Sequence, residues 1–290
     1  MDKLLVVGSG LLGSKAIEIG KKSYTVYGTY NKTYKNGLIQ LNVVNQKAVS
    51  RTIERLRPDF VLDTHALNNL DFCETHHAAA WDINVNGSRN VAKACKKINA
   101  KYIYISSDYV FSGKKRVYSE NDNPDPINYY GKTKSAAEEM LKSLDINMII
   151  IRTSAIYGAI SSTGKESFVQ WLIQNLKKGN EVQIMTDIFS SPTLNSELAD
   201  IAFNLYELGY EGIFHIVGRD NISKYEFATM ISREFGLNQN LIKPTTSSQI
   251  FGSQKIRPLR VRLSTNKIKK IIGKPPIGAK AGLRILHKSM

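Results

Sequence analysis

The chain is poor in cysteine and has no long apolar run. Its 290 residues include two cysteines, Cys73 and Cys95, and neither lies in a CxxC pair or near a histidine cluster. This argues against a disulfide framework or a zinc site, and fits a reducing compartment. No apolar stretch reaches the ~18 residues of a membrane span. The first apolar run, Leu4–Val7, lacks the features of a secretory signal. We therefore expect a cytoplasmic protein with no metal site and no membrane association.

Acidic residues are outnumbered, since 40 lysines and arginines face 25 aspartates and glutamates and give a net charge of +15. A nucleic-acid partner is nevertheless not expected, because the basic residues are spread along the chain and no zinc-finger or RNP-type aromatic motif accompanies them. A lysine-rich, solvated surface explains most of this charge. A positive surface would also suit a substrate that carries phosphates.

Short β-rich runs alternate with longer helical patterns in the first half of the chain. The runs Lys3–Val7, Tyr102–Ser106 and Met148–Arg152 are almost continuously apolar, which is typical of strands buried on both faces of a parallel sheet. Repeated β-α-β units predict an α/β fold with a Rossmann-type doubly wound parallel sheet. After about residue 153 the rhythm loosens, although helical patterns such as Glu166–Lys178 continue. We expect a NAD(P)-binding Rossmann domain over residues 1–152 and a smaller α/β substrate lobe over residues 153–290.

A glycine-rich loop follows the first expected strand. Gly8, Ser9, Gly10, Leu11, Leu12 and Gly13 form a G-x-G-x-x-G pattern that opens the first helix. The glycines permit a tight turn and a close approach to a pyrophosphate, and the helix N-terminus supplies free N–H groups and partial positive charge. The loop therefore predicts dinucleotide binding.

The end of the second strand bears on which dinucleotide is bound. In many such folds an acidic residue there holds the ribose 2′-hydroxyl, but this strand ends Tyr30-Asn31-Lys32 without a carboxylate. Lys32 could neutralise a 2′-phosphate. NADP(H) is therefore the preferred cofactor, with NAD(H) as the alternative.

Two motifs point to carbonyl reduction. Tyr130 and Lys134 lie four residues apart at the start of a helical stretch, so they share a helix face. A neighbouring ammonium would lower the pKa of the phenol and help Tyr130 to donate a proton to a carbonyl oxygen. Ser107, with Ser106 as the second choice, ends an expected strand and would polarise the same carbonyl.

These residues, taken in order, resemble the dTDP-4-dehydrorhamnose reductase family of extended short-chain dehydrogenases, which also includes the regulatory beta subunit of methionine adenosyltransferase. The likeness covers nearly the whole chain. It rests on SSDYVF at 106–111, YGKTK at 130–134, RTS at 152–154 with YG at 157–158, SPT at 191–193, GIFH at 212–215 with Gly218, SKYEF at 223–227, and RP at 257–258 with Ser264.

The resemblance implies a Rossmann domain and a discontinuous C-terminal lobe, with a segment that returns to the Rossmann domain. By motif, Ser107, Tyr130 and Lys134 would be the catalytic triad. Asp108 would lie at the sugar, Asn42 and Val43 near the adenine, and the loop His65, Ala66 and Leu67 beneath the cofactor. The implied reaction is reduction of the C4 ketone of a dTDP-linked 6-deoxyhexulose by NAD(P)H.

The sequence departs from the family pattern at several of these positions. The glycine loop is one residue shorter, Asn42 replaces an aspartate, and His65-Ala66-Leu67 replaces an apolar loop. Ala155 stands where the reductases have a tryptophan against the sugar, and the segment 187–193 also differs.

Three functions remain open: a reductase of dTDP-4-dehydrorhamnose, a reductase or epimerase of another nucleotide sugar, and a cofactor-binding regulatory subunit with little turnover. The protein partners left open are a second copy of the chain and, for the third function, a methionine adenosyltransferase catalytic subunit.

Overall fold

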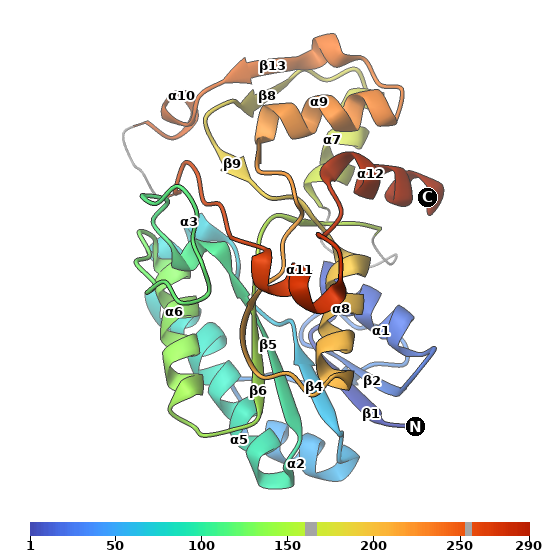
Figure 1. Ribbon diagram of the computed structural model, residues 1–290, viewed down its shortest axis with the longest axis vertical. Coiled ribbons are helices and arrows are strands. Elements are labelled where there is room, and N and C mark those ends of the chain that lie inside the picture. The colour runs from blue at the N-terminus through green and yellow to red at the C-terminus, as the bar shows by residue number, and fades with distance from the viewer. Residues whose placement is uncertain (160–166, 253–256) are drawn as a thin grey trace.

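The architecture is given by a computed structural model, which describes residues 1–159, 167–252 and 257–290. Its centre is a seven-stranded parallel sheet with the order β11-β6-β5-β4-β1-β2-β3 (Figure 1). Long runs of buried β-branched and aromatic residues form these strands, and every residue of the fifth strand is buried. The strands are β1 (Lys3–Val7), β2 (Thr25–Tyr30), β3 (Ile39–Gln40), β4 (Phe60–Asp63), β5 (Lys101–Ser107), β6 (Met148–Thr153) and β11 (Gly212–His215).

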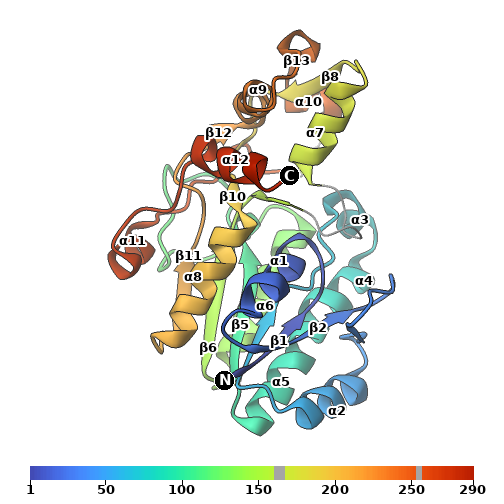
Figure 2. The same ribbon diagram turned by 90° about the vertical axis from the view of Figure 1, so that its right-hand side faces the viewer.

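Helices cover both faces of the large sheet (Figures 1 and 2). Each face buries its own apolar core against the helices that cross it. One face packs against α1 (Leu11–Gly20), α8 (Asn195–Glu207) and α11 (Asn266–Ile272), and the other against α2 (Gln46–Leu56), α5 (Ser88–Ile98) and α6 (Tyr129–Lys142). The expectation of a doubly wound Rossmann-type sheet is confirmed.

The connection from β4 to α5 is a chain of short helical segments. It consists of α3 (Leu70–Thr75), α4 (His77–Trp81) and a π-helical turn, η1 (Asp82–Gly87). Such π-turns are rare and are often found at functional sites. A short 3-10 turn, η2 (Asp108–Val110), follows β5.

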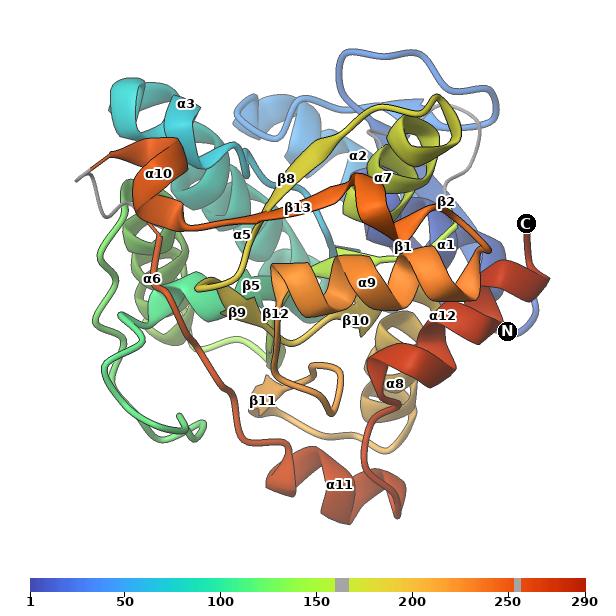
Figure 3. The same ribbon diagram turned by 90° about the horizontal axis from the view of Figure 1, so that it is seen from above.

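The remaining elements form a smaller lobe above the sheet (Figures 1 and 3). Their shared core is separate from the two cores of the large sheet. The lobe contains the parallel pair β8 (Val182–Met185) and β13 (Ile242–Thr245), two short pairs, β7 (Ile156–Tyr157) with β10 (Thr193–Leu194) and β9 (Phe189–Ser190) with β12 (Ile222–Ser223), and α7 (Phe168–Lys177), α9 (Lys224–Glu234), η3 (Gln239–Leu241), α10 (Ser247–Phe251) and α12 (Ala279–Lys288).

Some expected boundaries shift. The helix expected over Glu166–Lys178 is observed as Phe168–Lys177, because Ser167 closes a capping box with Gln170, and residue 166 lies outside the described residues. The domain boundary at 152/153 stays a prediction. The structure adds that β11, at residues 212–215, pairs with β6 in the large sheet.

The strand order locates the edge where a ligand can enter. From β1 the chain proceeds to β2 on one side, and then crosses to β4 on the other. Open α/β sheets bind ligands at the carboxyl ends of the strands beside such a switch point. The glycine loop after β1 and residues 64–67 after β4 flank this position. Among the described residues, no helix is long and apolar enough to cross a membrane.

Candidate active site

The glycine loop combines one crowded side with one open side. Gly8 has φ of +93°, in the left-handed region that favours glycine. A Cβ on Gly13 would lie 2.0 Å from the Gly8 carbonyl oxygen, whereas a Cβ on Gly10 would have no heavy atom within 4 Å. The backbone is therefore tightly packed beneath the loop and open above Gly10. Leu12 is buried, and Leu11 is half-buried at the start of α1. This arrangement fits a pyrophosphate laid against the helix N-terminus.

A lysine that sequence reasoning did not select lies on this loop. Lys35 Nζ donates to the Ser9 carbonyl oxygen and to Ser14 Oγ, the latter at 3.3 Å. Burial lowers the pKa of Lys35. Lys32, by contrast, is exposed, as is Asn31. Lys35 was not singled out because no spacing rule indicates that the stretch after β2 folds back over the loop.

The other expected residue at the end of β2 lies beside an aromatic neighbour. The Tyr30 ring meets the Tyr34 ring edge-on at 5.7 Å. Asn31 is tied to β3, since its carbonyl oxygen accepts from Gln40 Nε2 at 3.3 Å. These contacts tie the segment after β2 to itself and to β3, while Lys35 ties it to the glycine loop.

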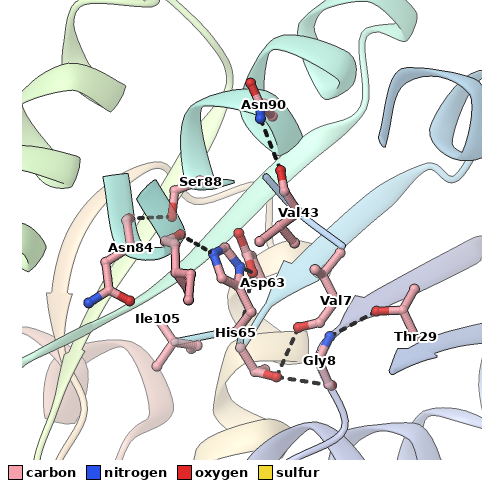
Figure 4. A network of polar contacts seen from close by, with 12 residues as sticks. Val7, Gly8, Thr29, Val43, Asp63, His65, Asn84, Ser88, Asn90 and Ile105 are labelled. Carbon is pink, nitrogen blue, oxygen red and sulfur yellow. Dashed lines mark hydrogen bonds and ion pairs between the residues drawn. The ribbon is translucent and has the colours of Figure 1, made fainter. Parts of the chain in front are cut away.

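Hydrogen bonds join the loop after β4 to the glycine loop (Figure 4). Thr64 Oγ1 donates to the Val7 carbonyl oxygen at 3.0 Å, and Gly8 N–H donates to Thr29 Oγ1 at 3.0 Å. A Cβ on Gly8 would lie 3.1 Å from the His65 backbone nitrogen. The ends of β1, β2 and β4 are thus packed together at the switch point.

The expected cofactor segments after β3 and β4 lie beside one another. Val43 is buried and Asn42 exposed, and Asn90 Nδ2 donates to the Val43 carbonyl oxygen at 2.9 Å. A Cβ on Gly87 would lie 2.7 Å from Val43 Cγ2 and 3.0 Å from His65 Nε2, so both side chains pack against η1. In the same loop as His65, Ala66 is exposed and Leu67 is half-buried.

The three expected catalytic residues converge at the end of β5. Ser107 is the last residue of β5, and Tyr130 and Lys134 lie on the buried face of α6. The Ser107 hydroxyl forms a side-chain hydrogen bond that acts to lower the pKa of Tyr130, while burial, the larger effect, raises it. Asn128 caps this helix by accepting from Gly131 N–H at 2.7 Å.

The lysine of this group is held by its surroundings. Lys134 Nζ donates to the Ile105 carbonyl oxygen at 2.6 Å and lies 4.1 Å from the centroid of the Tyr104 ring. Burial lowers the pKa of Lys134 to about 8, although the carboxylates of Asp63 and Glu138 act against this shift. The expected lowering of the Tyr130 pKa by Lys134 is not observed, because burial of the phenol dominates. Tyr130 therefore remains protonated at neutral pH, as a proton donor must.

Asp108 lies next to the triad and is itself buried. It accepts hydrogen bonds from Ser107 Oγ and Ser154 Oγ. Burial raises the pKa of Asp108 to about 6. Ala155, the next residue after Ser154, is exposed and has φ of +43°. A non-glycine residue rarely adopts this conformation, and a methyl group there offers no aromatic surface.

A buried charged network supports β5 and β6 from below. Arg152 Nη2 donates to Glu138 Oε2 at 2.6 Å, and both side chains are 1% exposed. Ser106 Oγ donates to Glu138, and Arg152 Nη1 faces His215 Nε2 at 3.4 Å. The hydroxyl of Ser106, the second choice for the catalytic hydroxyl, therefore donates its proton within this network.

Two further cations lie near the triad. Arg257 Nη2 donates to both carboxylate oxygens of Asp71 at 3.0 Å, and within the described part of the chain its buried Nη1 has no hydrogen-bond partner. The positive charge of Arg257 opposes the rise in the pKa of Tyr109 that burial causes. Burial lowers the pKa of Lys224, and Arg257 lowers it further. Neither residue could be placed here from sequence, since each comes from the second half of the chain.

Over residues 1–159, 167–252 and 257–290, no three histidine, cysteine or acidic side chains are grouped so that they could hold a metal ion.

Comparison with known proteins gives a family and several relatives. The family model described as "RmlD substrate binding domain" matches residues 1–289. The spore coat polysaccharide biosynthesis protein SpsK of Bacillus subtilis is 32% identical over 92% of this chain and 91% of its own length. Methionine adenosyltransferase 2 subunit beta of Rattus norvegicus is 30% identical over 92% of this chain and 81% of its own length.

A solved structure is similar over the whole molecule. It is a dTDP-4-dehydrorhamnose reductase of Bacillus anthracis in complex with NADP, which is 27% identical and superposes with a TM-score of 0.90 over 100% of this chain and 99% of that one.

Proposed function

Because the chain belongs to the dTDP-4-dehydrorhamnose reductase family, we propose that it is an NAD(P)H-dependent reductase that acts on the 4-keto group of a nucleotide-linked deoxysugar. The substrate that the resemblance favours most is dTDP-4-dehydrorhamnose. The observation that carries the proposal is the meeting of Ser107, Tyr130 and Lys134 at the carboxyl end of β5, on the same edge of the sheet as the glycine loop that follows β1.

The dinucleotide would be held by the segments at the switch point. The open face of Gly10 and the N-terminus of α1 suit its pyrophosphate, and Lys35 suits a 2′-phosphate because its ammonium already lies at Ser9. His65 and Val43 border the same region. When bound, the reduced cofactor supplies the hydride that reduces the ketone carbon.

The residues of this chain supply the proton and the orientation. Tyr130 remains protonated at neutral pH because burial raises its pKa, so it can give its proton to the carbonyl oxygen. Ser107, whose hydroxyl lies beside that phenol, can donate a hydrogen bond to the same oxygen and stabilise its developing charge. The Lys134 ammonium keeps positive charge beside the reacting group.

The cations near Tyr109 suit the diphosphate of a nucleotide sugar. Arg257 presents a buried N–H donor without a partner among the described residues, and guanidinium groups bind phosphate oxygens through paired N–H donors. Lys224 lies within electrostatic reach of Arg257. Asp71 neutralises part of the Arg257 charge, and Lys224 adds a second cation, so the pair of cations retains a net positive charge that favours an anionic ligand.

The test is oxidation of NADPH or NADH by purified protein given dTDP-4-dehydrorhamnose. Oxidation that is lost in Tyr130→Phe supports the proposal. Cofactor binding without oxidation would reject this substrate. The next substrates to assay would then be other nucleotide-linked 4-keto sugars, because Ala155 replaces the tryptophan that lies against the sugar in the reductases.

A second candidate is a cofactor-binding regulatory subunit. It is favoured by the 30% identity with methionine adenosyltransferase 2 subunit beta over 92% of this chain. The triad does not separate the two functions, so co-purification with a methionine adenosyltransferase from the same source, together with a change in its kinetics, is the deciding observation.

A further inference from the structure

Two hydrogen bonds tie the helix α6 to the strand β5. Lys134 Nζ donates to the Ile105 carbonyl oxygen at 2.6 Å. One helical turn later, Glu138 Oε1 accepts from Ser106 Oγ at 2.5 Å, and both of these side chains are buried. Because the two helix residues are four apart and the two strand residues are consecutive, the bonds together fix the helix along the strand.

The two bonds differ in what else their donors must do. In the proposed function the Lys134 ammonium lies beside the reacting group, so its environment changes when ligands bind. Ser106 and Glu138 are enclosed in protein and take no part in proton or hydride transfer. Their bond can therefore persist unchanged throughout the reaction.

Glu138 is itself held in one position. Arg152 of β6 donates to both of its carboxylate oxygens, from Nε to Oε1 at 3.0 Å and from Nη2 to Oε2 at 2.6 Å. The guanidinium carbon of Arg152 lies 5.0 Å from the centroid of the Phe111 ring, and its Nη1 faces His215 Nε2 at 3.4 Å. Paired bonds of this kind restrict a buried carboxylate to a single geometry. The bond from Ser106 therefore ends on a fixed point.

This bond acts on the geometry of the triad. Ser106 directly precedes Ser107, and Glu138 lies two turns beyond Tyr130 on the buried face of α6. The Ser107 hydroxyl and the Tyr130 phenol are joined by a hydrogen bond, so a shift of the helix along the strand would separate them. Catalysis depends steeply on such distances, because a misplacement of about 1 Å can lower a rate about a hundredfold.

We propose that Ser106 and Glu138 are positioning residues, whose hydrogen bond holds α6 against β5 so that Tyr130 and Ser107 meet the carbonyl oxygen together. This inference rests on the proposed function. It gives the buried acid one turn beyond Lys134 a part in the rate of reduction, through geometry and without contact with the cofactor or the substrate.

Two substitutions break the same bond from its two ends. Ser106→Ala removes the donor and leaves the ion pair between Glu138 and Arg152. Glu138→Asp keeps a carboxylate for Arg152 but shortens the side chain by one methylene, so the acceptor withdraws from Ser106. Ser232→Ala is the matched control, because Ser232 of α9 is also fully buried and its hydroxyl donates to the Thr229 carbonyl oxygen at 2.9 Å, within the upper lobe.

The chemical step is measured in a single turnover, by mixing the complex of protein and NADPH with a nucleotide-linked 4-keto sugar that the unaltered protein reduces. We expect the rate to fall at least about tenfold in Ser106→Ala and in Glu138→Asp, while the Kd for NADPH and the KM for the ketone change by less than about threefold. The double variant should lose no more than the worse single variant, because both changes remove one bond. The rate in Ser232→Ala should stay within about twofold, since that site is distant and independent, although its urea midpoint should fall by an amount similar to that in Ser106→Ala.

An unchanged single-turnover rate in Ser106→Ala would overturn the inference, as would losses that multiply in the double variant. A loss seen only as a higher KM would also overturn it, because the bond would then serve binding. Failure of the proposed function looks different, since the unaltered protein would then reduce no 4-keto sugar nucleotide. Hydrogen exchange of the α6 amides would still report on the bond: we expect exchange about tenfold faster in Ser106→Ala, and equal exchange would show that the bond does not fix the helix.

Discussion

Lys35 reaches back across the glycine loop, so that its ammonium rests on the carbonyl oxygen of Ser9. Lys32, three residues earlier, is exposed. We expect Lys35→Met to weaken NADPH binding about tenfold or more relative to NADH, because a charge-assisted contact with a phosphate is worth about 1.5–3 kcal/mol. Lys32→Met is the matched control, with an expected change under about threefold. Fluorescence titration with both dinucleotides measures the affinities of the two variants. A larger loss of NADPH affinity in Lys32→Met than in Lys35→Met would identify Lys32 as the phosphate ligand.

Tyr130→Phe should remove at least about 99% of turnover, since positioned proton transfer contributes about 10²–10⁴-fold. Affinity for NADPH should change little. Tyr129→Phe is the control, because Tyr129 stacks on His77 with ring centroids 3.8 Å apart and its own hydroxyl is not part of the triad. Steady-state rates with the ketone substrate, together with cofactor titration, provide the comparison. Unchanged rates in Tyr130→Phe would refute the assigned proton donor.

Gly10 and Gly13 should respond in opposite ways to alanine. At Gly13 the new Cβ would lie 2.0 Å from a backbone oxygen, so we expect the free energy of unfolding to fall by about 1–3 kcal/mol or more. At Gly10, where φ is −72° and the space is open, stability should change by less than about 1 kcal/mol. Dinucleotide affinity should nevertheless fall at least about tenfold, the equivalent of 1.4 kcal/mol. Urea unfolding and cofactor titration of both variants test this, and full affinity in Gly10→Ala would place the pyrophosphate elsewhere.

Asp108 makes stability depend on pH. Its folded-state pKa is about 6, above the ordinary value of 3.8, so the folded protein favours the protonated acid. The resulting stabilisation is complete below pH 4 and is lost as pH rises through 6. Asp108→Asn, a neutral isostere, should therefore be more stable than the unaltered protein at pH 8, by up to about 3 kcal/mol. Near pH 4 the two should be equal. Denaturant midpoints at both pH values test this, and a gain of the same size at pH 4 would exclude ionisation as its cause.

Arg152 and Glu138 should be strongly coupled. Arg152→Met leaves a buried carboxylate without its cation, and we expect a loss of about 3–5 kcal/mol in the free energy of unfolding. Adding Glu138→Gln removes the charge but keeps an acceptor for Ser106, so the double variant should regain at least about half of the loss. A double-mutant cycle by urea unfolding measures the coupling, and additive losses would show that the pair is not held together by charge.

The fold was predictable because its signals are local. Apolar runs such as Met148–Arg152 indicate strands buried on both faces, and glycines directly after β1 indicate the turn into α1. The proximity of Tyr130 and Lys134 was likewise predictable, since residues four apart in a helix lie on the same face. The short strand β3 has no such signal, because only Ile39 and Gln40 pair with β2.

What escaped prediction depends on contacts between distant residues. Lys35 is found on the glycine loop only once the stretch after β2 has folded back. The ion pair between Arg257 and Asp71 joins residues 186 positions apart, and no periodic pattern in the sequence indicates it. The pKa of Tyr130 also differs from expectation, because burial depends on the whole molecule whereas the lysine four residues away is visible in the sequence.

The position of β11 limits how this architecture can be recombined. After β6 the chain builds part of the upper lobe and then returns to pair Gly212–His215 with β6. Its remaining elements complete that lobe, apart from α11, which packs on the large sheet. A newly synthesised chain therefore carries an unpaired β6 edge until more than fifty further residues have been made. A single splice between two genes cannot exchange the upper lobe without also exchanging an edge strand of the sheet. A new substrate specificity is therefore more readily acquired by point substitutions in the loops at the carboxyl ends of the strands than by replacement of the lobe.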